Sequence, residues 1–540
     1  MRKALKAASL LLAGVLAACS SGQDGPEVNY VSVNGSEPQN PLLPAGTTET
    51  GGGDIIDQIF SGLVGYDTDG KAYNEVATNI STTDATTFKV ELHRDRKFSD
   101  GSPVQAHNFV RAWDYAVEHS QTGADFFAPI KGFEEGKAHM EGLKVVDDYT
   151  FTITLASPQA DFPIQLGHSS FFPLPDVAFD DMEAFGQLPV GNGPYKMERW
   201  DHNVAATLVP NPEYVGERTL ANSGAQVRFY TTPNAAYADV LSGQLDIIKD
   251  VPSSAFTTYQ DELGDGAVNK PVAVFQGFTI PQNLPHFSGE EGALRRAAIS
   301  LAINRPQVTH AIFADTRTPA RDFTSPVLPG YSADIPGAEV LEFNPQRARE
   351  LWDKADAISP YEGTFTISYN SDGGHKPWAD AVANQLKNNL GIQAEGTAYP
   401  DFKSLRDDIT NRTITGAFRT GWQGDFPAMS GFLTQTYRTG AGSNDGDYSN
   451  PRFDAELDAA ASAPSVEEAN KHYRAAQAIL LKDLPAIPLW YSNVTGGSGP
   501  RVSNVHFNWK SVPELSAVVK EGDPGPGGGA DNKTQGHGKE

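Results

Sequence analysis

Residues 363–422 alternate between two kinds of hydrophobic pattern. Three short runs have the composition of strands (GTFTISYN, IQAEGTAY and TITGAFRTGW), and two runs between them have the spacing of helices (KPWADAVANQLKNNLG and DFKSLRDDI). The first of these helices has an apolar stripe followed by a glycine C-cap: Trp378, Val382, Leu386, Leu390 and then Gly391. A strand–helix–strand–helix–strand series predicts a largely parallel sheet, and therefore an α/β fold.

The whole chain has 540 residues, which is too long for one ordinary domain and suggests two or three. Apolar residues make up 39%, enough for sizeable cores, and 52 glycines with 37 prolines indicate many turns. Nearer the N-terminus, helical spacing predicts helices around residues 55–63 and 109–116, and strand patterns occur at 86–94 and 149–155. A mixed α/β chain is therefore favoured over a helical bundle.

The first residues, MRKALKAASLLLAGVLAACSSG, have the layout of a secretory signal. Three positive residues (Arg2, Lys3 and Lys6) precede an uncharged stretch, 7–18, which is too short to span a bilayer as a stable helix. The sequence Leu-Ala-Ala-Cys19 resembles the lipobox of bacterial lipoproteins, in which the signal is cut before the cysteine and lipid is attached to it. Cys19 is the only cysteine of the chain. An ordinary signal with an incidental cysteine is the alternative.

Loss of residues 1–18 would remove three positive charges and change the net charge from −25 to about −28. Such a surface repels nucleic acid and anionic lipid headgroups, so we expect contact with a membrane only through lipid on Cys19. Residues 19–29 are small and polar, as a tether would be. Residues 521–540 lack apolar periodicity and are expected to form a disordered tail.

The residues that catalysis or metal binding would need are scattered along the chain. The 12 histidines show no metal-ligand spacing, and a single cysteine excludes a cysteine-rich zinc site. The segment LGHSSFF (166–172) approaches a nucleophile elbow but has Phe171 where the second glycine belongs. We therefore expect no enzymatic activity, no metal and no cofactor.

The segment GWQGDFPAMSGFL (421–433) holds one carboxylate, Asp425, and neither lysine nor arginine. It follows the last strand of the parallel series, and loops at the carboxyl ends of such strands are where these sheets bind ligands. A carboxylate in an apolar cleft needs a cationic partner, or else its pKa shifts. Asp425 is therefore a candidate for binding a cationic group. From these residues alone, an Asx-turn to its own backbone is the preferred alternative.

Several further motifs follow one another from about residue 30 to 515, and their ordered set resembles one family. They are FSDGSPV (98–104) with Phe109 and Trp113, GNGPY (191–195) with Trp200, NP (211–212) with Tyr214, SGQLD (242–246), LR (294–295) with Ala298 and NR (304–305), and Tyr448 with NP (450–451) and FD (453–454). The family is that of the solute-binding proteins of peptide ABC importers, of the oligopeptide- and dipeptide-binding type.

The resemblance implies an α/β, periplasmic-binding-protein-like fold of two lobes, with an extra domain in the first lobe and a hinge between the lobes. Ligand would bind in the cleft, and closure of the hinge would bury it. The expected division assigns residues 30–65, 190–275 and 491–520 to lobe I, 66–189 to the extra domain and 276–490 to lobe II.

The resemblance also implies site residues. In peptide-binding members the loop has roughly the pattern Arg-x-x-Trp-x-x-Asp, which Arg419, Trp422 and Asp425 match. The family aspartate accepts hydrogen bonds from the α-ammonium of the peptide, so Asp425 is expected to do the same. Trp422 is expected to form a wall of a side-chain pocket, and Arg419 to meet the carboxylate of a short peptide. Core packing is the alternative for Trp422, and pairing with a local acid is the alternative for Arg419.

Three other residues are candidates for contact with the ligand. Trp490 and Tyr491 lie where the family's chain crosses back between the lobes, although either could be a buried strand residue instead. Asn444 is a further candidate in the segment that follows the loop.

The implied function is that of a monomeric, lipid-anchored solute-binding protein facing outside the cytoplasm. It would capture short peptides and present them to an ABC permease, whose ATPase drives import. The same fold serves other solutes, so an oligosaccharide, a nickel complex, haem or an opine is an alternative ligand. A surface hydrolase or an adhesion module is a more distant alternative.

Overall fold

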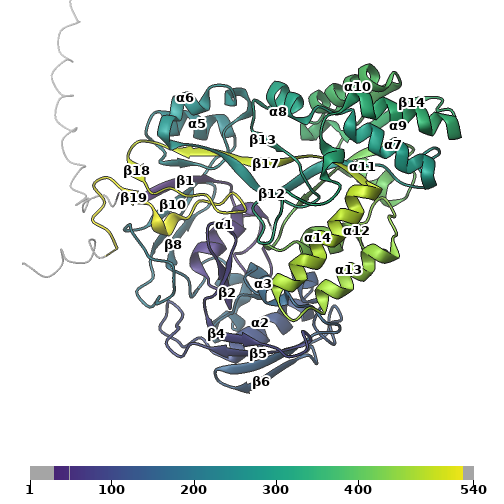
Figure 1. Ribbon diagram of the computed structural model, residues 1–540. Helices are drawn as coiled ribbons and strands as arrows, with labels where there is room; N and C mark the ends of the chain where they lie inside the picture. Colours follow the sequence, from purple (N-terminus) through teal and green to yellow (C-terminus); the bar gives the residue numbers. More distant parts are fainter. Residues whose placement is uncertain (1–28, 48, 527–540) are drawn as a thin grey trace, which may run out of the picture.

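The computed structural model describes residues 29–47 and 49–526, which form two lobes joined by a pair of long strands (Figure 1). The predicted signal (1–18), Cys19, nearly all of the predicted tether and most of the predicted tail at 521–540 lie outside the described residues. The predicted α/β class and the two-lobed architecture are confirmed.

One sheet runs through both lobes. Its strands, in spatial order, are β15 (Gln393–Tyr399), β14 (Thr364–Asn370), β16 (Ala417–Gln423), β12 (Ala267–Thr279), β17 (Ala486–Ser498), β11 (Ile247–Ile248), β1 (Val31–Gly35), β10 (Ala225–Phe229), β9 (Ala205–Pro210) and β8 (Tyr195–Asp201), with β13 (Arg317–Pro319) also paired to β17. The two longest strands, β12 and β17, pair antiparallel and extend from one lobe into the other (Figure 1). Their pairing is interrupted between Pro271 and Phe275, and again between Gln276 and Gly277.

The predicted strand–helix–strand–helix–strand series is confirmed as β14, α10 (Lys376–Leu390), β15, α11 (Phe402–Thr410) and β16. Strand β14 pairs in parallel with both β15 and β16. The apolar stripe of α10 is buried, and Gly391 ends the helix with a positive φ of 76°. Because β16 enters the sheet next to the hinge strand β12, the loop that follows β16 is placed where the lobes meet.

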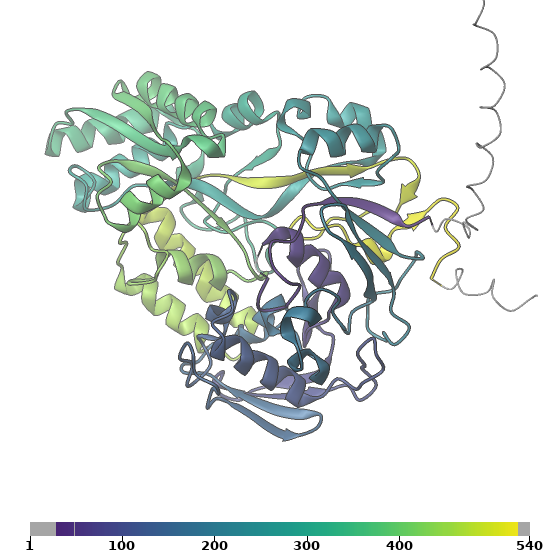
Figure 2. The ribbon, with the colours of Figure 1, turned by 180° about the vertical axis from the view of Figure 1, so that it is seen from behind.

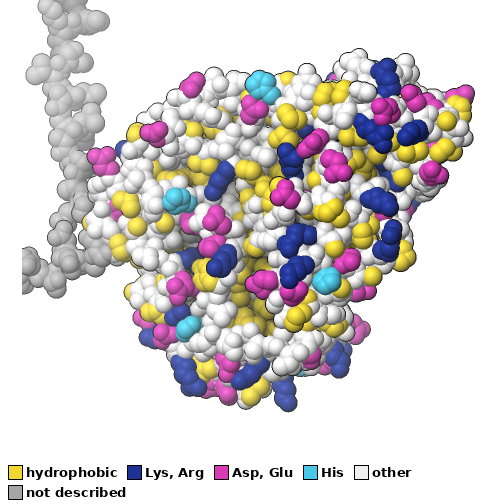
Figure 3. Space-filling model, in the orientation of Figure 1, with side chains coloured by type: hydrophobic (Ala, Val, Ile, Leu, Met, Phe, Trp, Pro, Cys, Tyr) yellow, Lys and Arg dark blue, Asp and Glu magenta, His cyan; other side chains and the backbone are white. Residues whose placement is uncertain are grey.

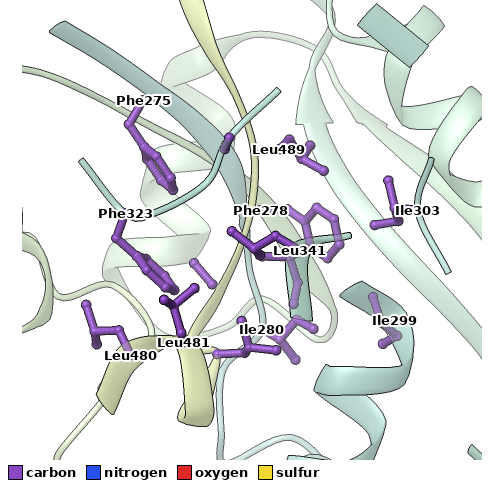
Figure 4. Packing of buried hydrophobic residues seen from close by; sticks show 14 of the residues in the cluster. Phe275, Phe278, Ile280, Ile299, Ile303, Phe323, Leu341, Leu480, Leu481 and Leu489 are labelled. Atoms are coloured by element: carbon purple, nitrogen blue, oxygen red, sulfur yellow. The ribbon is translucent and has the colours of Figure 1, made fainter. Parts of the chain in front are cut away.

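Each lobe has its own hydrophobic core. Buried residues within 31–272 and 494–518 form the core of lobe I, and those within 273–491, joined by Trp509, form the core of lobe II. Figure 4 shows part of the lobe II core, where Phe275 and Phe278 of β12 lie close to Phe323, Leu481 and Leu489. The chain therefore changes lobes between Val272 and Ala273 on β12, and between Tyr491 and Val494 on β17.

Helices complete both lobes. Lobe II has α7 (Gly289–Leu301), α8 (Arg305–Phe313), α9 (Pro345–Ile358), α12 (Ser430–Tyr437), α13 (Pro451–Ala461) and α14 (Val466–Asp483) in addition to α10 and α11. Lobe I has α1 (Thr50–Ile59), α2 (Ala106–Glu118), α3 (Phe162–Gln165), α4 (Met182–Phe185), α5 (Pro233–Leu241) and α6 (Tyr259–Leu263). Within the described residues, no helix has both the length and the apolar character that crossing a bilayer requires.

Two small sheets lie in the first lobe, and one lies near the C-terminus. The four-stranded sheet has the order β4 (Ala77–Ser81), β5 (Thr87–Leu92), β7 (Thr150–Thr154) and β6 (Leu143–Asp147), and the two hairpins are β2 (Val64–Tyr66) with β3 (Ala72–Asn74), and β18 (Val502–Ser503) with β19 (Val519–Lys520). Helix α2 packs on the four-stranded sheet, and Phe109 stacks on Phe151 with ring centroids 5.8 Å apart. This region shares a continuous core with the rest of lobe I.

The lobes also touch away from the hinge strands. The backbone N–H of Ala160, in the extra region of lobe I, donates to the carbonyl of Ala461 in α13 at 2.8 Å. Next to it, the Tyr473 hydroxyl of α14 donates to the buried carboxylate of Asp161 at 3.2 Å. Seen from front and back, α13 and α14 lie beside this part of lobe I (Figures 1 and 2). The two lobes thus contact each other both at the hinge strands and at this second place.

Candidate ligand-binding site

A cavity of about 650 Å³ is lined by residues of lobe I and by Asp425, which lies in the loop that follows β16. The other lining residues come from 57–75, 167–172, 217–219 and 508–517. On the face drawn in Figure 3, hydrophobic side chains line a hollow between the positions of α1 and α14. We call the cavity the Asp425 cavity.

The walls of the Asp425 cavity are acidic. They carry more carboxylates than permanent cations, namely Asp57, Asp67, Glu75, Glu217, Asp425 and Glu514 against Arg218 and Lys510. His168 also lines the cavity, but burial lowers the pKa of its ring to about 3, which keeps it neutral near pH 7. The arrangement favours a ligand that brings positive charge.

The loop after β16 is held against the hinge. The backbone N–H of Gly424 donates to the carbonyl of Ala273 on β12 at 2.9 Å, and Asp425 follows directly. Its side chain is open to the cavity, yet desolvation by the surrounding residues raises the pKa of its carboxyl, and the charge of Lys510 opposes that rise. Within the described part of the chain, no donor hydrogen-bonds this carboxylate. The Asx-turn that the sequence also allowed is therefore not formed there.

Lys510 reaches the same cavity from lobe I. Its Nζ lies 2.5 Å from Oδ2 of Asp57, which is in the last turn of α1. Burial alone would lower the pKa of Lys510, but the carboxylates of Asp57, Asp54 and Asp425 raise it. The lysine is therefore charged near pH 7, and it lines the same cavity as Asp425.

A second cavity, of about 230 Å³, lies within lobe II, between β16, α11, α12 and residues 443–446. Three of the predicted residues line it: Arg419, Trp422 and Asn444. We call it the Arg419 cavity. The structure thus brings these three residues together and places Asp425 in the neighbouring Asp425 cavity.

Arg419 is held in place without a carboxylate. Its Nε donates to Oδ1 of Asn370 at 2.9 Å, and the guanidinium lies 4.7 Å from the ring centroid of Phe402. Burial lowers the pKa of Arg419, nearby Arg406 lowers it further, and Asp372 opposes both. In contrast, Arg406 is neutralised by Asp445, with N–O distances of 2.5 and 3.2 Å. Arg419 is therefore the cation of this cavity that is available to an anion.

Asn444 and Trp422 use their polar groups differently. The amide of Asn444 is buried and folds its own loop, because it donates to the carbonyls of Arg438 and Tyr448 and accepts from the N–H of Tyr448. Trp422 is half-buried beside the lobe II core, and its Nε1 is buried with no hydrogen-bond acceptor among the described residues. The indole N–H can therefore bond to a ligand at no cost to the fold.

Trp490 and Tyr491 line neither of these cavities. Both are 1% exposed on the hinge strand β17. Trp490 donates to Oε1 of Gln276 at 2.8 Å, and the Tyr491 hydroxyl donates to Oδ1 of Asp322 at 2.7 Å. Contact with ligand stays a prediction for these two residues, and the geometry favours the packing role that the sequence also allowed.

Sequence reasoning missed the lobe I half of the site. Lys510 and Asp57 were not identified, because no motif marks them and both lie far from Asp425 in the sequence. The one available signal was the position of Asp57 on the polar side of a helix whose other face is apolar. In lobe II, Phe402 and Arg406 were also missed, although they lie on the predicted helix of residues 401–409.

The sequence pattern of the family described as "Bacterial extracellular solute-binding proteins, family 5 Middle" matches residues 71–444 of this chain. The chain therefore belongs to the family 5 extracellular solute-binding proteins of bacteria, as the motifs predicted.

Relatives and solved structures agree with this assignment. The chain is 27% identical to the periplasmic oligopeptide-binding protein OppA of Escherichia coli over 518 residues, which covers 89% of this chain and 93% of OppA. Among solved structures, the unliganded open form of the murein tripeptide-binding protein MppA has a TM-score of 0.81, with 23% identity and coverage of 92% of this chain and 98% of MppA. OppA of Haemophilus influenzae in complex with the peptide RPPGFSPFR has a TM-score of 0.68, with 23% identity and coverage of 92% and 99%.

Proposed function

We propose that this protein captures short peptides between its lobes and delivers them to an ABC permease. The peptide's α-ammonium binds Asp425, and its main chain lies extended along the cleft, as in strand addition. The observation that carries the proposal is the state of Asp425. Among the described residues no donor hydrogen-bonds this carboxylate, which lines an acidic cavity together with residues of lobe I and ends the Arg419–Trp422–Asp425 pattern.

The neighbouring Arg419 cavity supports a second point of contact. Arg419 presents a guanidinium that has no carboxylate partner among the described residues, which suits the carboxylate of a short peptide. Trp422 would form a wall of the pocket, and its indole N–H would donate to the ligand. Asn444 would shape the pocket through its loop. Trp490 and Tyr491 would act through the hinge on which they pack.

Closure of the lobes would complete the site. The greater similarity to an unliganded open form than to a peptide complex supports an open state for the structure described here. Rotation about β12 and β17 would bring Asp425 towards lobe I and exclude water from the ligand. The closed, loaded surface would then be presented to the permease, whose ATPase drives import.

Delivery requires that the protein stay at the outer face of the membrane. Lipid on Cys19 would hold it there, with residues 20–29 as the tether. The first described residue supports this arrangement: Asn29 bonds to the carbonyl of Glu521 on the surface of lobe I, so the tether would leave from that lobe. Replacing Cys19 by serine is expected to release the protein from the membrane fraction, and retention there would contradict the anchor.

The class of ligand can be tested directly. The chain from Ser20 onward, which includes every described residue, would be purified, and the small molecules released on denaturation would be identified by mass spectrometry. Short peptides with free amino termini are the expected result. An oligosaccharide, a nickel complex, haem or an opine would instead assign the protein to a sister specificity and give Asp425 another role.

A further inference from the structure

Asp425 lines the same cavity as a cation that belongs to the protein itself. Lys510 and Asp57 line the cavity from lobe I, and Asp425 lines it from lobe II. Lys510 is paired with Asp57, Asp425 lines the same cavity, and the three groups together carry one negative charge. One ammonium from a ligand would neutralise the set.

The position of Lys510 is fixed by its loop. The side-chain oxygen of Asn508 accepts hydrogen bonds from the backbone N–H groups of Lys510 (3.1 Å) and Val512 (3.0 Å). The carbonyl of Trp509 accepts from the N–H of Ala273 on the hinge strand at 2.9 Å, and the Trp509 ring meets Tyr66 edge-on at 5.8 Å. Lys510 is therefore tied to the point where the chain changes lobes.

The side chain of Lys510 is also positioned. Its Nζ lies 2.5 Å from Oδ2 of Asp57, and the two side chains are only 32% and 21% exposed. The backbone carbonyl of Asp57 in turn accepts from Arg218, which also donates to the carbonyl of Phe60 at 2.8 Å. Asp57 therefore holds the ammonium of Lys510 at a fixed place in the lining of the Asp425 cavity.

We infer that Lys510 is a specificity-determining residue, which partly neutralises Asp425 and so limits how strongly the protein prefers free over blocked peptide amino termini. The inference rests on the proposed function of Asp425. With a free amino terminus, Lys510 repels the incoming ammonium. With a blocked one, Lys510 leaves Asp425 with a cation nearby, so a neutral group can be tolerated.

Replacing Lys510 by methionine tests this inference. Calorimetry would give the Kd of Ala-Ala-Ala and of N-acetyl-Ala-Ala-Ala for the chain from Ser20 onward. In Lys510→Met, the ratio of the two Kd values (acetylated over free) is expected to rise about tenfold, because Asp425 then depends on the ligand alone for a cation. The matched control is Lys403→Met, which removes an exposed lysine paired with Asp407 on α11 and should leave the ratio unchanged.

A variant with the opposite sign protects the test against a misfolded loop. In Asp57→Asn, Lys510 loses its partner and interacts with Asp425 alone, so the ratio is expected to fall. An equal change of both Kd values in Lys510→Met, with no change of the ratio in Asp57→Asn, would overturn the inference and leave Lys510 a structural residue.

A double-mutant cycle separates this inference from the proposed function. In an Asp425→Asn background, Lys510→Met should no longer change the ratio. If Asp425→Asn alone gives the same ratio as the unmodified protein, the proposed binding of the ammonium by Asp425 is wrong. It is also wrong if the unmodified protein binds neither peptide. If the ratio depends on Asp425 but not on Lys510, the inference about Lys510 is wrong and the proposed function of Asp425 stands.

Discussion

The Asp425 cavity and the Arg419 cavity differ in charge, in size and in the lobes that build them. Among the described residues, the carboxylate of Asp425 in the first cavity has no hydrogen-bond donor, and Arg419 in the second has no carboxylate partner. The first cavity is lined by lobe I and Asp425, whereas the second is built by lobe II alone. Under the proposed function, motion about the hinge would change the first cavity and leave the second intact. The comparison then teaches that β16 would supply a preformed contact at Arg419, and the loop after β16 a contact at Asp425 that closure would complete.

The largest effect is expected from Asp425→Ala, which removes the carboxylate that lobe II contributes to the Asp425 cavity. Affinity for Ala-Ala-Ala should fall by roughly 2–5 kcal/mol, the scale for removing one partner of a buried charge pair. Calorimetry measures the loss. Asp67→Ala is the control, because Asp67 lines the same cavity but its carboxylate accepts the N–H groups of Asp69 and Lys71. Equal affinities of the two variants for Ala-Ala-Ala would contradict a special role of Asp425 in binding the ammonium.

A smaller loss is expected from Arg419→Gln in the preformed cavity. Affinity should fall by about 1.5–3 kcal/mol, the value of a hydrogen bond to a charged group. The loss should be confined to peptides with a free carboxylate, so titration of Ala-Ala-Ala against its C-terminal amide measures it. Arg412→Gln is the control, since Arg412 pairs with Asp447 on the surface. A uniform loss for both peptides would point to packing rather than carboxylate binding.

The hinge strand is expected to respond in stability and not in affinity. Tyr491→Phe removes the hydroxyl that bonds to buried Asp322 and accepts two backbone N–H groups. The free energy of unfolding should fall by about 1–3 kcal/mol, the cost of leaving buried polar groups unsatisfied. Urea unfolding measures this change, with Tyr230→Phe, at the half-buried Tyr230–Asp239 bond, as a control. A loss of affinity at unchanged stability would return Tyr491 to the ligand site.

Lower pH should weaken the Asp425 contact and spare the Arg419 contact. Desolvation raises the pKa of Asp425, so its carboxylate is protonated at a higher pH than usual and can then no longer hold an ammonium. Affinity should then fall about tenfold for each pH unit below that pKa. The same raised pKa makes the folded, unliganded protein slightly more stable as pH falls through it, because the folded state binds the proton more tightly than the unfolded state.

Calorimetry of Ala-Ala-Ala between pH 7.5 and pH 4.5 would follow this effect. The dependence should disappear in Asp425→Asn, in which the side chain no longer titrates. Persistence of the same slope in that variant would assign it to another group.

The sequence predicted lobe II better than it predicted lobe I. The series from β14 to β16 is contiguous in the chain, and its periods of two and 3.6 residues are strong, so the strands, the helices and the loop of Asp425 could all be placed. Lys510 and Asp57 could not be placed, because their position in the same cavity as Asp425 depends on how the C-terminal segment packs between α1 and the hinge. Contacts of that kind leave no local pattern in a single sequence.

Trp490 and Tyr491 illustrate a second limit. A strand buried on both faces reads as a continuous apolar run, and AIPLWYSN at residues 486–493 is such a run. Alternation then cannot say which side chains face a cleft. The packing of Trp490 and Tyr491 depends on their hydrogen bonds to Gln276 and Asp322, and both partners are distant from the run in the sequence.

The smallest effect is expected from Trp422→Phe, and it distinguishes the two roles open to that residue. The Nε1 of Trp422 is buried with no acceptor among the described residues, so its loss should change the free energy of unfolding by less than about 1 kcal/mol. If the N–H donates to the ligand in the Arg419 cavity, affinity should fall by about 0.5–1.5 kcal/mol, as for one hydrogen bond. Urea unfolding and calorimetry on the same sample measure both quantities. A drop in stability with unchanged affinity would make Trp422 a core residue, and the Arg419 cavity would then read its ligand through Arg419 alone.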